Sequence, residues 1–190
     1  MSTRTLISQA ALRVDLESMP IERSNRRLAA ARITAIARQL LEASTLCAIA
    51  TVTRSGRAHV NTAYFAWSRD FEIVWLSEPG ATHSRNLRAN PSTAIAVYDS
   101  GQTWGKPDRG IQLFGSAREA RDEDAEAARR LYATRFPGFR DIDLSAYRFY
   151  RFTPSRLKLF DEPALGAATF VTARVGRNRR LAWERTLIYR

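Results

Sequence analysis

The sequence is poor in the residues that build covalent or metal cross-links. Its 190 residues include one cysteine, Cys47, and two histidines, His59 and His83. A single thiol cannot form an intrachain disulfide, and these counts are too low for a Cys-rich or His-built metal site. We therefore expect no metal centre, and a reducing cytoplasm is the simplest location for the protein.

Long apolar segments and common catalytic motifs are also missing. No apolar run approaches the roughly 20 residues that a membrane-spanning helix requires. Asp15 and Glu17 interrupt the amino-terminal segment where a signal peptide would be apolar. The GxSxG elbow, the Walker loop and the HExxH zinc motif are absent. We expect neither membrane association nor the usual hydrolase and nucleotide-hydrolase chemistries.

Lysine is scarce, whereas arginine is abundant. The 30 Lys and Arg residues exceed the 19 Asp and Glu residues by 11, and the only lysines are Lys106 and Lys158. A basic excess is typical of proteins that bind phosphate groups. The arginines are scattered from Arg4 to Arg190, a distribution that fits compositional bias equally well. Charge alone therefore does not identify a partner.

The pattern of apolar residues predicts a mainly β protein with a few helices. We expect an amino-terminal arm over residues 1–23 and one domain over 24–190, which begins with an amphipathic helix in 24–44. A second helix is expected at 121–135, with acidic residues in its first turn. Short, closely spaced antiparallel strands favour a barrel. The predicted strands are 45–53, 58–67, 71–77, 92–98, 110–119, 147–160 (interrupted by Pro154), 168–175 and 181–189.

The first helix has an arginine-rich outer face, which resembles a DNA-recognition helix. No second helix joined by a short turn follows it, because the next segment is a strand. No aromatic and basic stacking face accompanies the helix. Nucleic-acid binding is therefore not the expected main function.

The segment between Ser77 and Pro91 carries a cluster of polar donors. A strand ends at Ser77, the chain turns at Pro79-Gly80, and a short helix follows over 84–88. Its start holds Thr82, His83, Ser84, Arg85 and Asn86. Unpaired N–H groups and the positive dipole end of a helix suit a phosphate group. The competing interpretation is that Thr82 or Ser84 only caps the helix while His83 and Arg85 are solvated.

Five pieces of sequence occur in a characteristic order over about residues 40–120. Together they resemble the FMN-binding split-barrel family typified by pyridoxamine 5′-phosphate oxidase. The NLRANP turn is the most specific piece. The pieces are Ala50-Thr51-Val52 with Gly56, Ser77, Thr82-His83, Asn86-Leu87-Arg88-Ala89-Asn90-Pro91, and Gly115-Ser116-Ala117-Arg118.

The resemblance implies a six-stranded antiparallel split barrel that forms a homodimer, with one FMN in each groove between protomers. Asn61, Thr62, Ala63 and Tyr64 would lie along the flavin ring and ribityl chain. Leu76 and Ser77 would support the ribityl-phosphate end. Thr82 and His83 would bind the phosphate, with Ser84, Arg85 and Asn86 as neighbours. Arg109, Gly110 and Gln112 would approach the flavin from the partner chain.

The sequence departs from the pyridoxine-active branch at the phosphate site. That branch has arginine at the position aligned with Asn61 and an Arg-Lys pair in place of Thr82-His83. Arg85 is therefore expected to supply the fixed cation, and the substrate is expected to differ from pyridoxamine phosphate. Since flavin performs the hydride and electron steps itself, the absence of an acid–base pair fits an oxidoreductase acting on a small molecule.

Several alternatives stay open at this stage. The cofactor could be a deazaflavin of the 8-hydroxy-5-deazaflavin type, or the protein could bind flavin or haem without turnover. Trp104, Gln102 and Tyr64 are candidates for a substrate wall, although Trp104 could equally serve ordinary packing of its Gly/Pro-rich loop. His59 is expected at a surface or interface, and Cys47 in the core.

Overall fold

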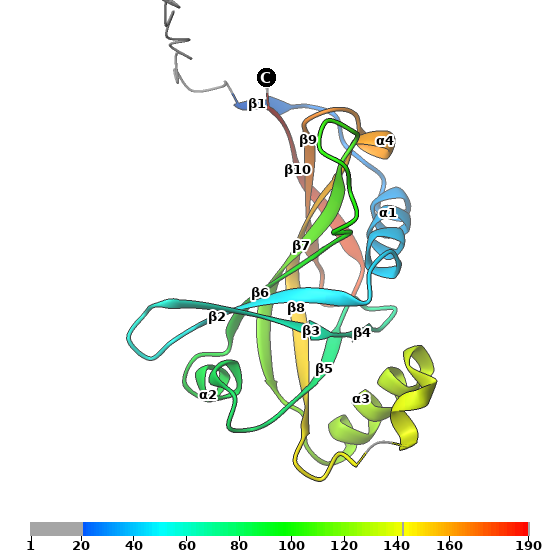
Figure 1. The fold of residues 1–190 in the computed structure, drawn as a ribbon. Coiled ribbons are helices and arrows are strands. Elements are labelled where there is room, and N and C mark those ends of the chain that lie inside the picture. Colours follow the sequence, from blue (N-terminus) through cyan, green and yellow to red (C-terminus); the bar gives the residue numbers. More distant parts are fainter. Residues whose placement is uncertain (1–20, 142, 190) are drawn as a thin grey trace, which may run out of the picture.

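The computed structural model describes residues 21–141 and 143–189 (Figure 1). The helices are α1 (Ala30–Glu42), α2 (Thr82–Ala89), α3 (Asp122–Arg135) and α4 (Glu162–Leu165), with a 3-10 helix η1 at Pro137–Asp141. The strands are β1 (Ile21–Ser24), β2 (Leu46–Val52), β3 (Ala58–Tyr64), β4 (Ala66–Trp67), β5 (Ile73–Ser77), β6 (Ser92–Tyr98), β7 (Arg109–Glu119), β8 (Arg148–Asp161), β9 (Thr169–Val175) and β10 (Leu181–Tyr189).

All strand pairs in the described chain are antiparallel, and the strands form one highly curved sheet. Its order is β1-β10-β9-β8-β7-β6-β2-β3, while β5 pairs with both β4 and the first part of β8. The mainly β, split-barrel fold expected from the sequence is confirmed. The sheet has ten strands rather than six. One difference is that the single expected strand 58–67 is divided at Phe65 into β3 and β4.

Pro154 was expected to interrupt β8, but the strand runs unbroken past it. The pairing of β7 with β8 shifts register between Phe114 and Gly115, and Gly115 lies opposite Pro154. A Cβ at Gly115 would lie 2.1 Å from the carbonyl oxygen of Thr153. The extra residue of this bulge is Ser155 of β8, next to the proline that lacks an N–H, and β7 approaches β8 too closely there for any side chain at Gly115.

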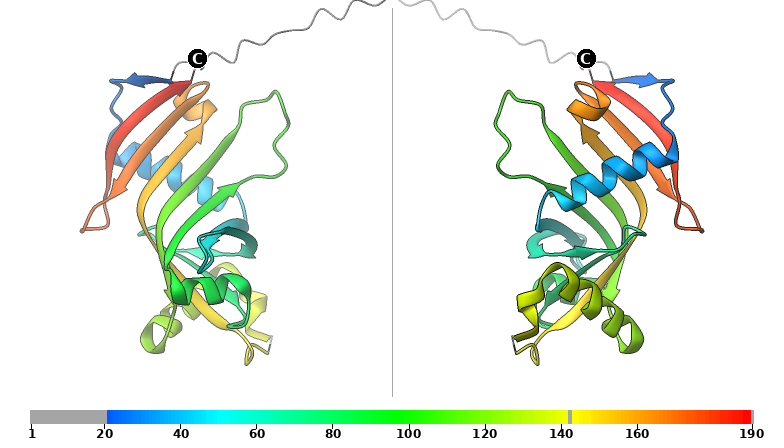
Figure 2. Two further views of the ribbon diagram at one scale, coloured as in Figure 1. Left: turned by 90° about the vertical axis from the view of Figure 1, so that its left-hand side faces the viewer. Right: turned by 90° about the vertical axis from the view of Figure 1, so that its right-hand side faces the viewer.

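Helix α1 packs across one face of β6, β7, β8 and β10 (Figure 2). Its apolar residues Ile33, Ile36 and Leu40, which are three and four positions apart, share one face of the helix. They are buried against inward-facing residues of these strands, such as Leu113 and Leu157. A sheet and one amphipathic helix therefore share the main core. A smaller cluster under α3 combines aromatic rings, including Tyr132 and Phe139, with small residues such as Ala66 and Ala128.

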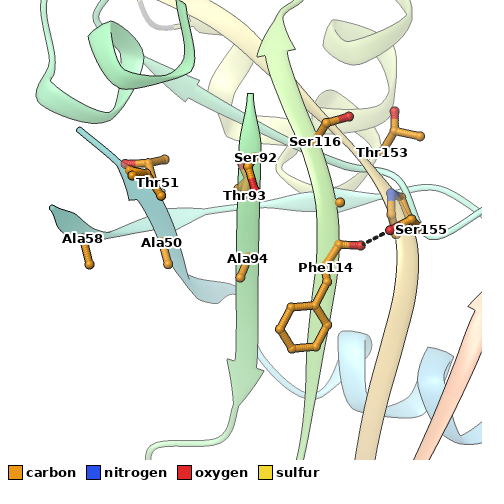
Figure 3. Close-up of a pocket in the computed structure, with 13 residues that line it drawn as sticks. Ala50, Thr51, Ala58, Ser92, Thr93, Ala94, Phe114, Ser116, Thr153 and Ser155 are labelled. Atoms are coloured by element: carbon orange, nitrogen blue, oxygen red, sulfur yellow. Dashed lines mark hydrogen bonds between the residues drawn. The ribbon is translucent and has the colours of Figure 1, made fainter. Parts of the chain in front are cut away.

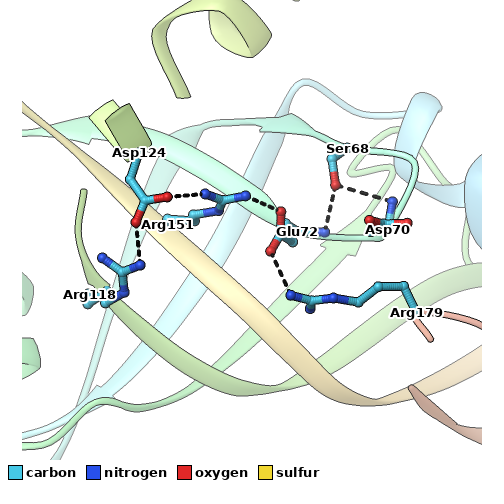
Figure 4. Close-up of polar contacts among 7 residues, drawn as sticks. All are labelled: Ser68, Asp70, Glu72, Arg118, Asp124, Arg151 and Arg179. Atoms are coloured by element: carbon cyan, nitrogen blue, oxygen red, sulfur yellow. Dashed lines mark hydrogen bonds and ion pairs between the residues drawn. The ribbon is translucent and has the colours of Figure 1, made fainter. Parts of the chain in front are cut away.

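A network of ion pairs fixes α3 and the β9–β10 turn to the barrel (Figure 4). Arg151 on β8 lies 2.5 Å from Glu72 and 2.6 Å from Asp124 of α3. Arg118 also bonds Asp124, and Arg179 lies 3.4 Å from Glu72. The hydrogen bond from Arg118 is the main cause of a lowered pKa at Asp124. Several arginines thus have a structural role.

The amino-terminal segment contributes one strand to the sheet. Residues 21–24, which span the end of the expected arm, form β1 and pair with β10. Most of the expected arm, 1–23, lies outside the described residues. Among the helices that the structure describes, none has the length and apolar character needed to cross a bilayer.

Candidate phosphate-binding site at the start of α2

Helix α2 lies against β2 and β3 because a buried hydrogen bond connects it to the sheet. The side-chain amide of Asn86 donates to Thr51 Oγ1 over 3.0 Å, and the two residues are 7% and 1% exposed. Leu87 adds an apolar contact with the core. The sequence predicted a helix at 84–88, and α2 extends two residues further toward Thr82 and one toward Ala89. Asn86 therefore faces the sheet and positions the helix.

Besides the Tyr150 hydroxyl, four buried polar atoms near α2 have no hydrogen-bond partner in the described chain. Two of them, His83 Nε2 and Ser84 Oγ, belong to α2. The others, His59 Nδ1 and Asn61 Oδ1, belong to β3 and lie on the same face of that strand because their positions differ by two. Buried polar groups are normally paired. Such a group of unpaired atoms marks the start of α2 as the candidate site for a polar ligand.

The start of α2 also offers backbone donors and a fixed cation. The first helical hydrogen bond runs from Arg85 N to Ala81 O over 3.0 Å, so the preceding amides of Thr82, His83 and Ser84 lie at the donor end of the helix. The Arg85 guanidinium bonds Gly80 O and lies 3.2 Å from Thr82 Oγ1. No side chain caps this helix. The interpretation of Thr82 or Ser84 as a simple cap is therefore wrong.

Burial, and then the neighbouring His59, lowers the pKa of His83. The imidazole is 7% exposed, and its ring meets the edge of Tyr150 at a centroid distance of 6.2 Å. Below this ring, Tyr150 stacks on Trp75 at 5.7 Å. His83 is thus a neutral donor or acceptor at pH 7 that can gain a proton when an anion binds beside it.

These donors fit a phosphate group. Helix amides, the Thr82 hydroxyl and the Arg85 guanidinium converge on one helix end, as anion sites require. A cavity of about 300 Å³ adjoins the helix, lined by Ser84, Leu87, Arg88, Arg118, Glu119, Arg121 and Tyr150. Ser77, at the end of β5, is 8% exposed, and the partly buried Leu76 precedes it.

The four predicted flavin contacts on β3 divide between two faces of the strand. Asn61 and Ala63 are partly buried, and Ala63 packs on the core. Thr62 and Tyr64 are exposed on the opposite face, where Tyr64 meets the edge of Phe136 at 5.9 Å. Side chains alternate along a strand, so one protomer directs only two of the four toward α2.

The predicted residues on β7 and in its preceding loop lie far along the sheet from α2. Arg109 makes a 2.9 Å ion pair with the fully buried Asp161. Gln102 accepts a hydrogen bond from Arg109 N and donates one to Asp99 O, which holds the loop in shape. Gly110 and Gln112 lie on β7, and Trp104 is 99% exposed at the loop tip. Within one protomer these residues do not reach the polar residues around the start of α2.

The outer face of β2, β3, β6 and β7 carries a run of small side chains among larger apolar ones. A depression of about 640 Å³ lies on this face, and Figure 3 shows residues that line it, including Ala50, Ala94 and Phe114. The same three residues also line a second depression of about 320 Å³. Val60, Tyr64 and Tyr98 are more than half exposed along these strands. We refer to this surface as the small-residue face.

Two residues beside the start of α2, His59 and Tyr150, were not among the predicted ligands. His59, expected at a surface or interface, is partly exposed on β3 and lies near enough to His83 to lower its pKa. Tyr150 lies below His83 with a buried, unpaired hydroxyl. The sequence could have indicated His59, because it is two positions from Asn61 and therefore on the same face of the strand. It could not have indicated Tyr150, because only the pairing of β5 with β8 brings that residue beneath α2.

Comparison with known proteins agrees with this arrangement. The family model described as pyridoxamine 5′-phosphate oxidase matches residues 33–161. A pyridoxine/pyridoxamine 5′-phosphate oxidase of Rubrobacter xylanophilus is 29% identical over 87 residues, which are 46% of this chain and only 36% of that relative.

Solved structures show the same fold at low sequence identity. A protein from Clostridium acetobutylicum, titled as related to general stress protein 26 of the pyridoxinephosphate oxidase family, is 13% identical, with a TM-score of 0.58 over 78% of this chain and 97% of its own. A heme binding protein from Mycobacterium smegmatis is 15% identical, with a TM-score of 0.59 over 86% and 89%. The chain belongs to the pyridoxamine 5′-phosphate oxidase family.

Proposed function

We propose that the protein is an FMN-binding oxidoreductase that acts on a small molecule in the cytoplasm. The observation that carries this proposal is the group of unpaired donors at the start of α2, in a chain of this family. FMN carries a phosphate dianion that matches the helix end. When bound, the flavin would supply the hydride and electron chemistry.

The chain's own residues would divide the work of binding. Thr82, His83, Ser84 and Arg85 would hold the phosphate, and Asn61 would face it from β3. Thr62, Ala63 and Tyr64 would lie along the flavin ring and the ribityl chain. Leu76 and Ser77 would lie at the ribityl-phosphate end. Asn86 acts by holding α2 to β2 through Thr51. The cations of the pyridoxine-active branch are replaced by Asn61, Thr82 and His83, which leaves Arg85 as the cation and supports a substrate other than pyridoxamine phosphate.

A homodimer would complete this site. The small-residue face exposes Val60, Tyr64 and Tyr98, and its alanines permit close approach of a second sheet. Pairing through it would bring Gly110 and Gln112 of one protomer toward the cofactor of the other. Trp104, which is almost fully exposed, would then contribute an aromatic wall to the substrate pocket, with Gln102 and Arg109 fixing its loop.

The test begins with the purified full-length chain. We expect a yellow protein, or an apoprotein that quenches FMN fluorescence in a saturable titration. Arg85→Gln should weaken FMN binding at least tenfold, because one charge-assisted contact to phosphate is lost. Arg54→Gln, an equal charge change in the exposed β2–β3 turn, should not. A protein that neither contains nor takes up FMN refutes the proposal.

Competition separates the remaining cofactors. An 8-hydroxy-5-deazaflavin that displaces FMN at equal concentration would favour a deazaflavin-dependent reductase. Haem binding with a shifted Soret band and no FMN uptake would favour a haem carrier. If FMN binds but its reduced form is reoxidised no faster than free reduced FMN by any acceptor, the protein is a non-catalytic flavin carrier.

A further inference from the structure

The two histidines of the chain, His59 and His83, are brought together by the packing of α2 on the sheet. His59 on β3 lies directly opposite Thr51 on β2, so both side chains are on the same side of the sheet. Thr51 accepts the buried hydrogen bond from Asn86. His83 precedes Asn86 by three positions, which places both on one face of α2, and both are buried. Strand register and helix docking therefore direct the two imidazoles toward the same end of the barrel.

Each imidazole has one buried nitrogen without a hydrogen-bond partner in the described chain. These atoms are His59 Nδ1 and His83 Nε2, and each is accompanied by an unpaired oxygen on its own element, Asn61 Oδ1 on β3 and Ser84 Oγ on α2. His83 is only 7% exposed, so water has little access to its ring. Buried polar atoms are normally paired. One strand and one helix thus each present an imidazole with unused hydrogen-bonding capacity.

The charged groups around the two imidazoles are mainly cations. Among the residues that the structure describes, neither histidine forms an ion pair with a carboxylate. Of the two nearby carboxylates, Glu119 lies 3.9 Å from Arg121 and Glu78 is exposed. No carboxylate therefore favours protonation of the histidines. The titratable and charged groups on the elements packed around them are Arg85 and Arg88 on α2, Glu78 in the turn before it, Arg57 just before β3, Arg118 and Glu119 on β7, and Tyr150 on β8, while β2 presents the non-titrating Thr51.

An anion beside this pair reverses the balance between the neutral and protonated imidazole. Burial, and then His59, lowers the pKa of His83 below its usual value of 6.5, so the ligand-free ring is neutral at pH 7. An opposite charge within hydrogen-bonding reach raises a pKa by about 1–3 units. A phosphate dianion would therefore draw a proton from solvent onto an imidazole. Because the two rings interact, that proton belongs to the pair rather than to one residue.

From this geometry we propose that His59 joins His83 as a phosphate ligand, and that the pair takes up a proton from solvent when the phosphate binds. The inference rests on the proposed function, because the phosphate is that of the flavin. Arg85 supplies a permanent charge, whereas the histidines supply theirs only while the ligand is present. The consequence is cofactor retention that depends on pH. FMN is held more tightly at mildly acidic pH, and its affinity falls as pH rises and the imidazoles lose their proton.

Proton NMR of the full-length protein, purified without a histidine tag, measures the pKa of each imidazole. The chain has two histidines, so two Cε1-proton signals are expected, and either His59→Gln or His83→Gln assigns them. In the apoprotein, His83 should titrate below 6.5. Saturating FMN should raise both pKa values by about one unit or more. Riboflavin, which lacks the phosphate, should raise neither, and Arg54→Gln in the exposed β2–β3 turn should leave the FMN-induced shifts unchanged.

FMN fluorescence quenching provides a second readout. FMN should bind about fivefold or more tightly at about pH 6.5 than at about pH 8.5, because each pKa unit gained on binding contributes up to tenfold in affinity. His59→Gln should reduce this ratio, and His83→Gln should reduce it further. Arg85→Gln is the matched control: it should weaken binding at both pH values by the same factor, since a guanidinium does not titrate in this range.

The outcomes separate this inference from the proposed function. FMN uptake with both histidine pKa values unchanged would overturn the inference and leave the proposed function intact, whereas no FMN uptake would refute both. A shift confined to His83 would exclude His59 as a ligand. Equal shifts with riboflavin would show that the phosphate is not the cause. If His83→Gln does not fold, His59→Gln still assigns both signals, and the pKa values of the unmodified chain decide the result.

Discussion

Replacing Asn86 tests whether α2 is held in place by one buried hydrogen bond. Asn86→Ala removes the amide that donates to Thr51 Oγ1 over 3.0 Å and leaves that hydroxyl, which is 1% exposed, without its partner. An unsatisfied buried group costs about 1–3 kcal/mol. For a chain of this size, that corresponds to a fall in Tm of about 2–12 °C.

The assay is urea unfolding followed by circular dichroism, with the midpoint and slope fitted together. Thr51→Val, Asn86→Ala and the double variant form a cycle, and we expect a coupling energy of at least about 0.5 kcal/mol. Asn25→Ala, an exposed asparagine, should change stability by less than about 0.5 kcal/mol. Additive single-variant effects would show that Asn86 and Thr51 do not stabilise each other and would refute this account of how α2 is positioned.

Three further predictions concern packing and titration. Gly115→Ala should destabilise the protein by about 1–3 kcal/mol in the same assay, because its Cβ would meet the Thr153 carbonyl at 2.1 Å, whereas Gly138→Ala meets open space and should not. Burial raises the pKa of Cys47 to about 12, so a thiol reagent at pH 8 should react only in urea; rapid labelling of the native protein would contradict this. The lowered pKa of His83 means that the unfolded chain binds the proton more readily, so unfolding free energy should fall as pH drops below about 6.5. His83→Gln should flatten that dependence, and an unchanged pH profile would show that His83 does not cause it.

The candidate site was predictable where its residues are close in sequence. The order Ser77, Pro79-Gly80 and Thr82 to Asn86 indicates a strand, a turn and the start of a helix, and β5 and α2 occur there. The sequence did not reveal that Asn86 faces Thr51, because residues 35 positions apart meet only after β2 and α2 pack. Gln102 and Arg109 are likewise engaged by a loop hydrogen bond and by Asp161, contacts that local patterns do not predict.

The sequence by itself determined the mainly β fold, through short alternating strands and turn residues, and the family, through ordered motifs such as NLRANP. Only the tertiary structure decided which polar groups stay unpaired and where the arginines act. Arg151 is part of a partly buried ion-pair network, whereas Lys158 and Arg174 lie on the outer face of the adjacent strands β8 and β9. The physical reason is that cross-strand register joins residues distant in the chain, and composition contains no information about that register.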